Sequence, residues 1–521
     1  MHRSLFRLLS LTLVPAAMWS CSSGGSGGGG GSGGSGSGGA SASGSGGTTG
    51  GASGSGGTSG SGGTAGGTGG AAMGSGGSNV DGGGQPDSGK TDAGGTGGAG
   101  TDGGGTGGAM AANTGQMFGS HKFQYPAGTI KPSAANLDTA VAAFYDKWKA
   151  TYVVSDCGGA YIATGGGTGA IANTVDVSEG QGYGMAIVPM MAGHDPNAQK
   201  TFDALYAVYH MFGSINDPNL MSWSIQDGCM VPHGNGDIND SATDGDMDIA
   251  YGLVLADRQW GSAGTINYLA EAKKIIGSIK AHEVNPMTNI MMMGDWADIK
   301  APYYTIRYMS MDGPYGGAQP FANFYYGTRP SDFMIDHFRA YARASGDQSW
   351  MAVVDATHTL VKKLEDGFAS STGLLPDFVE HLDTNPTPAM ANYLESEADG
   401  RVGYNSCRVP WHLATDYIVS GDVRAKTEAQ KITTWIKGKT GSDPTKIVDG
   451  YELGGANAGT GKVFAFEAPF GVAAIVDASN QAWLDAIWKD MVTNSPGTVS
   501  YYDDSIKMLS ILIMSGNWFA P

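Results

Sequence analysis

The sequence predicts an all-α fold, an (α/α)6 barrel in which six helical hairpins form a ring. Two observations carry this prediction. Twelve segments between residues 116 and 521 have the length and apolar spacing of helices, whereas few segments alternate apolar and polar residues as strands do. No linker interrupts 116–521, so we expect all twelve helices in one domain. Periodicity alone also allows an irregular helical array.

Residues 1–21 have the pattern of an export signal. Arg3 and Arg7 form a basic start, and the apolar run from Leu8 to Ala17 is too short to span a bilayer. A small residue precedes Cys21, which is similar to a bacterial lipoprotein signal, where the cysteine is lipidated and becomes the mature N-terminus. An ordinary secretory signal is the alternative. We expect an exported protein that contacts a membrane only through a lipid anchor on Cys21.

Residues 22–115 form a linker rich in Gly, Ser and Thr. Of the 87 glycines in the chain, 44 lie between Ser22 and Met110. Because such a segment has almost no apolar surface to bury, it cannot offset the entropy of ordering, and we expect it to be disordered. As a random coil it would reach about 50 Å.

The expected helices follow in chain order. Ser133 is a candidate cap for the first one, whose apolar face carries Leu137, Val141, Phe144 and Trp148. The third carries a stripe formed by Phe202, Leu205, Val208, Tyr209 and Phe212. The twelve expected ranges are 134–150, 178–193, 200–212, 244–258, 266–282, 331–345, 348–366, 408–420, 423–437, 464–476, 480–492 and 503–515.

Charge and cysteine content restrict the partners. The net charge is −18, of which the first 110 residues contribute −1, so the folded region carries −17. Such a surface repels nucleic acid but tolerates neutral or cationic ligands. No CxxC or HExxH motif supports a metal site, and no cofactor is implied. After export, Cys157, Cys229 and Cys407 allow one disulfide and one free thiol, or three free thiols, and their spacing does not choose among these.

Two segments place carboxylates where helices are expected to begin. Residues 177–185 (Val-Ser-Glu-Gly-Gln-Gly-Tyr-Gly-Met) carry Glu179 among three glycines, which weaken a helix but allow close approach. Residues 242–251 (Ala-Thr-Asp-Gly-Asp-Met-Asp-Ile-Ala-Tyr) carry Asp244 and Asp246. Composition alone favours ordinary structural roles for these acids. Asp244 would be an N-cap, and the other acids would interact favourably with the helix dipole. A calcium loop is not supported, because the glycine and terminal glutamate of an EF-hand are missing.

Together these segments resemble glycoside hydrolase family 8. Further pieces similar to that family lie at 294–296 (Gly-Asp-Trp), 330–334 (Pro-Ser-Asp-Phe-Met), 407–411 (Cys-Arg-Val-Pro-Trp) and 516–518 (Gly-Asn-Trp). At position 252, directly after the second segment, this chain has Gly where the family usually has Ala or Ser. The resemblance implies an (α/α)6 barrel that hydrolyses β-1,4-linked glycans with inversion, with 116–521 as the catalytic domain. It also implies that Glu179 is the general acid and that Asp244 binds and helps to distort the sugar.

The general base is where the chain departs from the common family pattern. Inversion needs a second carboxyl group, about 6.5–9.5 Å from the acid, to activate water. Many members have an aspartate where this chain has Asn405, three positions before Arg408. A similar subgroup has asparagine there and takes its base from a preceding loop. In the corresponding loop of this chain, residues 386–403, Glu395 matches that base best and Glu397 is the second candidate. The alternative is that both glutamates are solvated loop residues without a catalytic role.

Aromatic side chains complete a predicted glycan cleft, because sugar rings pack their C–H faces on aromatic faces. The residues expected to bind substrate are Trp223, Trp296, Tyr404, Asn405 and Arg408. Further aromatic candidates are Tyr304, Tyr315, Tyr326 and Trp411. Trp148 and Trp488 lie on amphipathic stretches and are expected in the core.

These expectations describe a monomeric, inverting endo-β-1,4-glycoside hydrolase that cleaves an extracellular polysaccharide. The asparagine-bearing subgroup includes chitosanases and enzymes that act on mixed-linkage glucans. An acidic protein suits protonated glucosamine units, so the sequence slightly favours chitosan over β-glucan or cellulose, with xylan further behind. The alternative is a catalytically silent glycan-binding surface lipoprotein, which Asn405 supports and the joint presence of Glu179 and Asp244 opposes.

Overall fold

The structure, a computed structural model, describes residues 115–165, 174–234, 237–297, 324–493 and 500–521. The predicted signal peptide with Cys21 and all but the last residue of the predicted linker lie outside the described residues.

All twelve predicted helices are present within these ranges, with ends that differ from prediction by a few residues. They are α1 (Leu137–Tyr152), α2 (Ser178–Met190), α3 (Ala198–Met211), α4 (Thr243–Trp260), α5 (Tyr268–His282), α6 (Ile335–Ser345), α7 (Trp350–Phe368), α8 (Val409–Ser420), α9 (Val423–Thr440), α10 (Phe464–Ala474), α11 (Gln481–Val492) and α12 (Tyr501–Met514).

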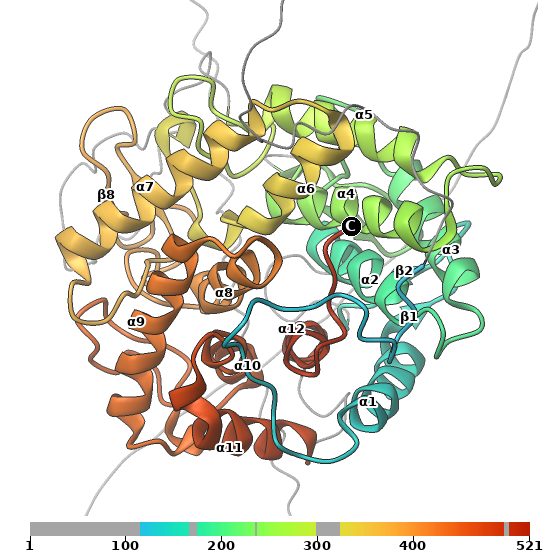
Figure 1. Cartoon of the computed structure of the whole chain (residues 1–521). Coiled ribbons are helices and arrows are strands. Elements are labelled where there is room, and N and C mark those ends of the chain that lie inside the picture. Colours follow the sequence, from blue (N-terminus) through green and yellow to red (C-terminus); the bar gives the residue numbers. More distant parts are fainter. Residues whose placement is uncertain (1–114, 166–173, 235–236, 298–323, 494–499) are drawn as a thin grey trace, which may run out of the picture. The chain divides into compact units, whose positions relative to one another are not determined.

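The helices form two concentric rings, which confirms the predicted (α/α)6 barrel. The even-numbered helices pack in the order α2, α4, α6, α8, α10 and α12, and α12 packs on α2 to close the inner ring. Each odd-numbered helix packs outside an inner one, with α1 against α12 and α3, α5, α7, α9 and α11 against their predecessors in the chain (Figure 1).

Burial distinguishes the two rings. Every residue of α2 and α10 is buried, as expected for helices surrounded by other helices. The outer α9 instead buries one stripe that includes Ala425, Ala429, Ile432 and Ile436, at spacings of three and four residues. The inner α2 and α10 therefore lack an exposed polar face, whereas the outer α9 is amphipathic.

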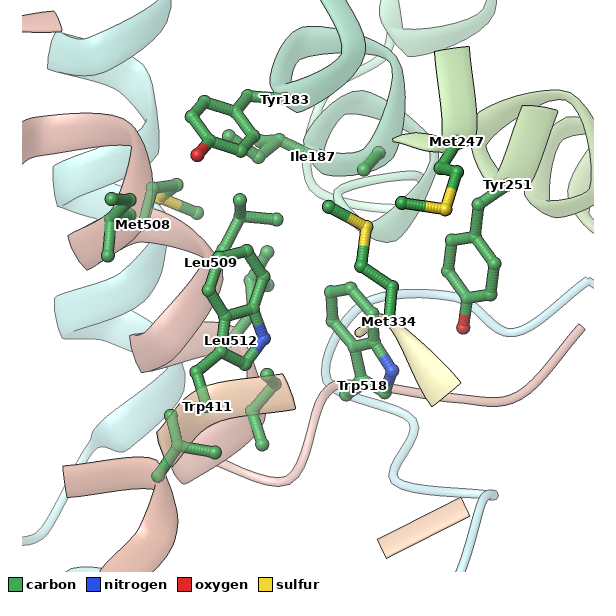
Figure 2. Packing of buried hydrophobic residues seen from close by; sticks show 14 of the residues in the cluster. Tyr183, Ile187, Met247, Tyr251, Met334, Trp411, Met508, Leu509, Leu512 and Trp518 are labelled. Carbon is green, nitrogen blue, oxygen red and sulfur yellow. The ribbon is translucent and has the colours of Figure 1, made fainter. Parts of the chain in front are cut away.

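The barrel interior is filled by side chains. Figure 2 shows large buried residues from several inner helices pointing toward one another. Tyr183 of α2, Tyr251 of α4 and Trp411 of α8 lie there with Trp518, which follows α12; each is at most 2% exposed. Trp148 and Trp488 are also buried, as predicted. The interior is thus a packed core, and a substrate site has to lie at one end of the barrel.

The two ends of the barrel differ. Residues 116–130 run across the C-terminal ends of inner helices: Phe118 N–H donates to Ala192 O beyond α2, Ile130 N–H to Ile475 O beyond α10, and Tyr125 Oη to Ile513 O of α12. This segment closes that end. The N-terminal ends of the inner helices face the opposite end, which we call the mouth.

Short antiparallel strand pairs and 3-10 turns join the helices around the barrel. The pairs are β1 (Val153–Val154) with β2 (Tyr161–Ile162), β3 (Thr174–Val177) with β4 (Ser224–Gln226), β5 (His233–Gly234) with β6 (Asp237–Ile238), and β7 (Val379–Glu380) with β8 (Thr387–Pro388). The 3-10 turns are η1 (Phe324–Tyr326), η2 (Pro330–Asp332), η3 (Ser406–Arg408), η4 (Pro444–Lys446) and η5 (Ala478–Asn480).

Three local expectations are corrected. Ser133 does not cap the first helix, because α1 begins at Leu137 after Asn136 in a left-handed conformation, and Ser133 N–H donates to Asp485. The helix expected from 331 begins at 335, because η2 occupies its predicted first turn. Asp244 is not an N-cap, since Ala242 precedes the first residue of α4.

The three cysteines that the structure describes form one disulfide and one free thiol, the first of the two predicted alternatives. Cys157, which follows β1, is bonded to Cys229, which follows β4, and Cys407 is a buried free thiol.

Each helix that the structure describes is too short or too polar to cross a membrane.

Candidate active site

Close packing of α2 against α4 brings Glu179 and Asp244 together at the mouth. Each carboxylate lies in the first turn of its helix. A Cβ at Gly182 would lie 2.6 Å from the Cβ of Asp248, and one at Gly245 would lie 2.4 Å from Ser178 Oγ. Glycine is therefore required at both positions for the two helices to approach this closely.

Arg408 joins these two carboxylates. Its side chain is 1% exposed, and Nη1 lies 2.7 Å from Glu179 Oε2 and 3.0 Å from Asp244 Oδ2. Tyr183 Oη accepts a third hydrogen bond from the same nitrogen at 3.1 Å. A buried guanidinium with several acceptors is held in one orientation, so Arg408 sets the spacing of the two acids.

The two carboxylates have different electrostatic environments. Burial raises the pKa of Glu179 to about 7; Arg408 opposes this shift and Asp244 adds to it. Burial also acts to raise the pKa of Asp244. Arg329 and Arg408 together outweigh burial and hold the pKa of Asp244 below its usual value. At neutral pH Asp244 is therefore ionised, whereas Glu179 retains a substantial protonated fraction.

A chain of hydrogen bonds continues from Arg408 to the predicted base loop. Arg408 Nη2 donates to Asn405 Oδ1 at 3.2 Å, and Asn405 Nδ2 donates to Glu395 Oε2 at 2.8 Å. Glu179 and Glu395 are thus linked through Arg408 and Asn405. Asn405 therefore contacts Glu395 directly and connects it to Arg408.

The loop that carries Glu395 is anchored on both sides of that residue. Tyr393 is completely buried, with its ring centroid 4.9 Å from Phe324 and 6.1 Å from Phe378. The Asp399 carboxylate accepts hydrogen bonds from the backbone N–H groups of 394, 395 and 396 at 2.7, 2.9 and 2.8 Å. These contacts fix the backbone at Glu395.

Glu395 and Glu397 differ in their surroundings. Glu395 is partly buried and bonded to Asn405, whereas Glu397 is exposed. Burial raises the pKa of Glu395 to about 8, and Arg329 opposes that rise. The segment turns instead of running extended.

The predicted aromatic residues have different positions. Trp223 lies beside the mouth, because its backbone O accepts the N–H of Ser178 at the start of α2. Trp296 packs edge-on against Phe324 at 5.4 Å, and the same Phe324 contacts Tyr393 of the base loop. Both tryptophans are partly exposed, as a sugar-contacting ring has to be.

Other aromatic candidates fit a sugar site less well. Tyr404 is partly buried, and its hydroxyl donates to Asp449 at 3.3 Å while its ring packs on Phe466. Trp411 is 2% exposed in the barrel interior, so its assignment to the cleft was wrong; its neighbours along the chain suggested a surface that the inner helix does not have. Tyr326 is partly exposed. Tyr304 and Tyr315 lie outside the described residues.

Sequence reasoning missed three polar residues at the mouth. Arg329, which precedes η2, lies 2.7 Å from Asp244 Oδ1 and pairs with Asp332 at 3.0 Å. Burial raises the pKa of Asp332 to about 7, against the effect of Arg329. Tyr501, the first residue of α12, donates to Glu179 Oε1 at 3.1 Å. The arginine directly before the Pro-Ser-Asp segment was a usable signal, because clustered buried carboxylates need a cationic partner.

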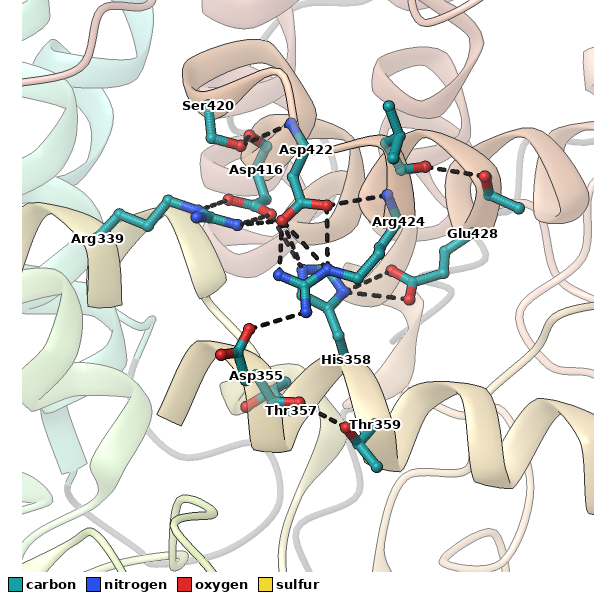
Figure 3. Close-up of polar contacts among 12 residues, drawn as sticks. Arg339, Asp355, Thr357, His358, Thr359, Asp416, Ser420, Asp422, Arg424 and Glu428 are labelled. Carbon is teal, nitrogen blue, oxygen red and sulfur yellow. Dashed lines mark hydrogen bonds and ion pairs between the residues drawn. The ribbon is translucent and has the colours of Figure 1, made fainter. Parts of the chain in front are cut away.

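A second cluster of charged side chains joins the α6–α7 hairpin to the α8–α9 hairpin, about two helical turns along α8 from Arg408 (Figure 3). Arg339 donates to Asp416 at 2.6 Å and to Asp422 at 2.8 Å. His358 Nδ1 lies 3.1 Å from Glu428, and its Nε2 lies 3.3 Å from Asp416. The acids of this cluster are already paired with cationic partners, which indicates a structural ion network.

Comparisons with known proteins agree with this geometry. The sequence profile of Glycosyl hydrolases family 8 matches residues 133–306 and 304–516. The chain is 42% identical over 398 residues to a beta-glucanase from Niallia circulans, a match that covers 76% of this chain and 89% of that relative. It is 38% identical over 407 residues to an endoglucanase from Bacillus sp. (strain KSM-330), covering 76% of this chain and 80% of the relative.

Solved structures show the same fold. A beta-1,3-1,4-glucanase from Paenibacillus sp. X4 superposes with a TM-score of 0.70 at 40% identity, covering 79% of this chain and 100% of that chain. A cold-adapted family 8 xylanase superposes with a TM-score of 0.58 at 19% identity and so shares the fold alone. The profile match over most of the chain, together with relatives at about 40% identity, shows that the chain is a glycoside hydrolase that belongs to family 8.

Proposed function

We propose that the protein is an inverting endo-β-glucanase in which Glu179 is the general acid and Glu395 the general base. The observation that carries this proposal is the hydrogen-bonded chain from Glu179 through Arg408 and Asn405 to Glu395. It places two carboxyl groups at one mouth but keeps them apart by two intervening side chains. Such a separation suits a mechanism that needs room for a water molecule.

The proposed reaction has one chemical step. Glu179 gives its proton to the glycosidic oxygen as the bond to the anomeric carbon breaks, while Glu395 takes a proton from the water that attacks the opposite face. Glu179 has to be protonated at the start, and its pKa of about 7 meets this need below neutral pH. The ionised Asp244 accepts hydrogen bonds from sugar hydroxyls and favours the developing positive charge on the ring.

Glu395 has to be ionised to act as a base, although burial raises its pKa to about 8. Its Oε2 already accepts a hydrogen bond from Asn405. A reacting water that donates to the other oxygen stabilises the ionised form further, because hydrogen bonds to a carboxylate favour its charge. Substrate binding that delivers this water therefore also favours the basic form of Glu395.

For the substrate we propose a β-glucan with β-1,4 linkages, mixed-linkage β-1,3-1,4-glucan first and cellulose-type glucan second. The support is the similarity to proteins named beta-glucanase, endoglucanase and beta-1,3-1,4-glucanase. Chitosan, which the sequence slightly favoured, is placed after both β-glucans, and the charge of −17 on the folded region is the observation that favours it. This order reverses that of the sequence-based expectation.

A reducing-sugar assay on lichenan, carboxymethylcellulose and chitosan tests the proposal, with folded Glu179→Gln protein as the control. We expect release of oligosaccharides from lichenan at a rate above that on chitosan. Faster release from chitosan would refute the proposed order of substrates. Lack of hydrolysis of every polymer by folded wild-type protein, with binding retained, would favour the silent glycan-binding lipoprotein instead.

We also propose that the protein is exported and anchored through a lipid on Cys21. The signal-like segment 1–21 and the small residue before Cys21 support this. Labelling with radioactive palmitate in a bacterial host should mark the wild type and fail with Cys21→Ala; equal labelling of both would refute the anchor.

A further inference from the structure

Three buried carboxyl groups lie behind the mouth and have no part in the proposed reaction. Asp246 and Glu283 are completely buried, and Asp295 is 9% exposed. Asp246 belongs to α4, Glu283 directly follows α5, and Asp295 directly precedes Trp296. Among the described residues, no Lys, Arg or His forms an ion pair with any of the three. Acids this deeply buried without a cation need another means of stabilisation.

Asp246 and Glu283 stabilise each other through a shared hydrogen bond. Asp246 Oδ1 accepts the N–H of Met221 at 2.7 Å, and Glu283 Oε1 accepts the Ser241 hydroxyl at 2.6 Å. No N–H or O–H donor of the described residues reaches the other oxygen of either group. These two oxygens gain a partner when the neighbouring carboxyl groups share a proton, because the protonated group can then donate to the other. Burial, with a neighbouring acid, raises the pKa of Glu283 to about 8 and that of Asp246 well above its usual value.

This pair lies beneath both tryptophan-bearing segments. Met221, which Asp246 holds, is two residues before Trp223. Ser241, which donates to the pair, also accepts the N–H of Asp295 at 3.1 Å, and its own N–H donates to that carboxylate at 2.9 Å. Asp295 is adjacent to Trp296. One polar network therefore determines where both tryptophans stand relative to α4.

We propose that Asp246 and Glu283 are a positioning pair that holds a proton between them, keeps the segments of Trp223 and Trp296 in their binding geometry, and loosens them when that proton is lost. Loss of the proton places two negative charges in contact inside the protein, where they repel strongly. The inference rests on the proposed function for its glycan ligand, but the proton itself can be tested without a ligand.

The other groups that face the pair do not supply a compensating cation. The titratable groups nearest to it are Asp295, Asp332 of η2, Tyr209 of α3 and Tyr341 of α6. Arg329, which precedes η2, is already paired with Asp332 and Asp244, and His337 of α6 is already paired with Asp248. Ionisation of the pair therefore adds a negative charge to an already acidic region.

The first test measures folding against pH without a ligand. A carboxyl group with a raised pKa in the folded state binds a proton that the unfolded chain has lost, so folding weakens as pH rises from the unfolded value to the folded one. Between about pH 5 and 8 the folding equilibrium constant of the wild type should fall about tenfold more per pH unit than that of Asp246→Asn. Glu283→Gln is the second variant, in case the first does not fold. Equal slopes for wild type and variant would overturn the shared proton.

The second test measures binding of a mixed-linkage glucan oligosaccharide by calorimetry in the Glu179→Gln background, which removes the titration of the acid. The Kd of Glu179→Gln should rise between about pH 7 and 9. This rise should be about three- to tenfold larger than the rise for the double variant that also carries Asp246→Asn. A difference of this size corresponds to the loss of about one hydrogen bond. Glu365→Gln, a buried acid paired with Lys431 on outer helices, is the matched control and should keep the parent's pH dependence.

The outcomes separate the parts of the inference. An identical pH dependence of Kd with and without Asp246→Asn would overturn the positioning role even if the folding slopes differ. If Glu179→Gln binds no β-glucan oligosaccharide at any pH, the proposed substrate class fails, and the folding slopes still decide whether the pair holds a proton.

Discussion

Replacement of the loop glutamate Glu395 by glutamine should abolish turnover and leave the fold intact. The change removes the group that takes the proton from water, and loss of a positioned base costs about 10²–10⁴-fold in kcat, or about 3 to 5 kcal/mol on the barrier. The amide oxygen of the introduced side chain can still accept the hydrogen bond that Asn405 donates at 2.8 Å, and the Asp399 contacts to the backbone remain. KM should therefore change less than about threefold.

The assay compares initial rates of reducing-end release from lichenan by wild type, Glu395→Gln and Glu397→Gln. Glu397 is exposed, so Glu397→Gln is the matched control and should retain activity within about twofold. Sodium azide adds a second readout with Glu395→Ala, because azide needs no base and can attack from the vacated side. It should raise the rate and give an α-glycosyl azide, whereas Glu179→Gln should not respond, since azide does not replace a proton donor.

Two results would refute this reasoning. If Glu397→Gln is inactive and Glu395→Gln is active, the base is two residues further along the loop. If both remain active, the base does not come from this loop. A further variant bears on the same point: Glu395→Gln combined with Asn405→Asp should regain about tenfold over Glu395→Gln alone, because Arg408 Nη2, 3.2 Å from Asn405 Oδ1, would favour an ionised aspartate there.

The remaining predictions concern the acid, the product and stability. Glu179→Gln should bind polymer but lose about 10²–10⁴-fold in kcat. Wild-type kcat at saturating substrate, where the bound water favours ionised Glu395, should fall as pH rises through about 7, because Glu179 loses its proton; ordinary activity of the variant would contradict the assignment. Proton NMR of a fresh digest should show the α anomer first, and initial β product would indicate retention. Replacing Cys157 and Cys229 by serine, which opens a crosslink between residues 72 positions apart, should lower the free energy of unfolding by about 2–4 kcal/mol in denaturant titrations. Burial lowers the pKa of His337, but nearby acids, including Asp248, outweigh burial and raise this pKa to about 9. His337→Gln should therefore cost about 3–5 kcal/mol at pH 7, a difference that shrinks as pH rises through 9; a difference independent of pH would refute the charged pair.

Local pattern was sufficient for the helices, whereas the ring was predicted from their number and from the family resemblance. Outer helices such as α9 have a polar face and an apolar stripe, and inner helices such as α10 are apolar on nearly every side, so each class could be identified from its own residues. The ends of the helices were harder to predict from the local pattern. Asn136 in a left-handed conformation starts α1 where Ser133 was expected to act, and the backbone N–H of Ser133 donates instead to Asp485 of the distant α11, a contact that no local pattern shows.

The sequence by itself, through its resemblance to a family, determined the candidates for the chemistry: an acid beside glycines, a second acid opening the next inner helix, and a loop glutamate that the resemblance puts forward because Asn405 stands where an aspartate is common. Only the tertiary structure decided how they meet. Arg408 and Arg329 come from segments far along the chain, and their contacts keep the pKa of Asp244 low while burial raises that of Glu179. Burial and charge pairing depend on which helices become neighbours in the ring, and that information is absent from any local window of sequence.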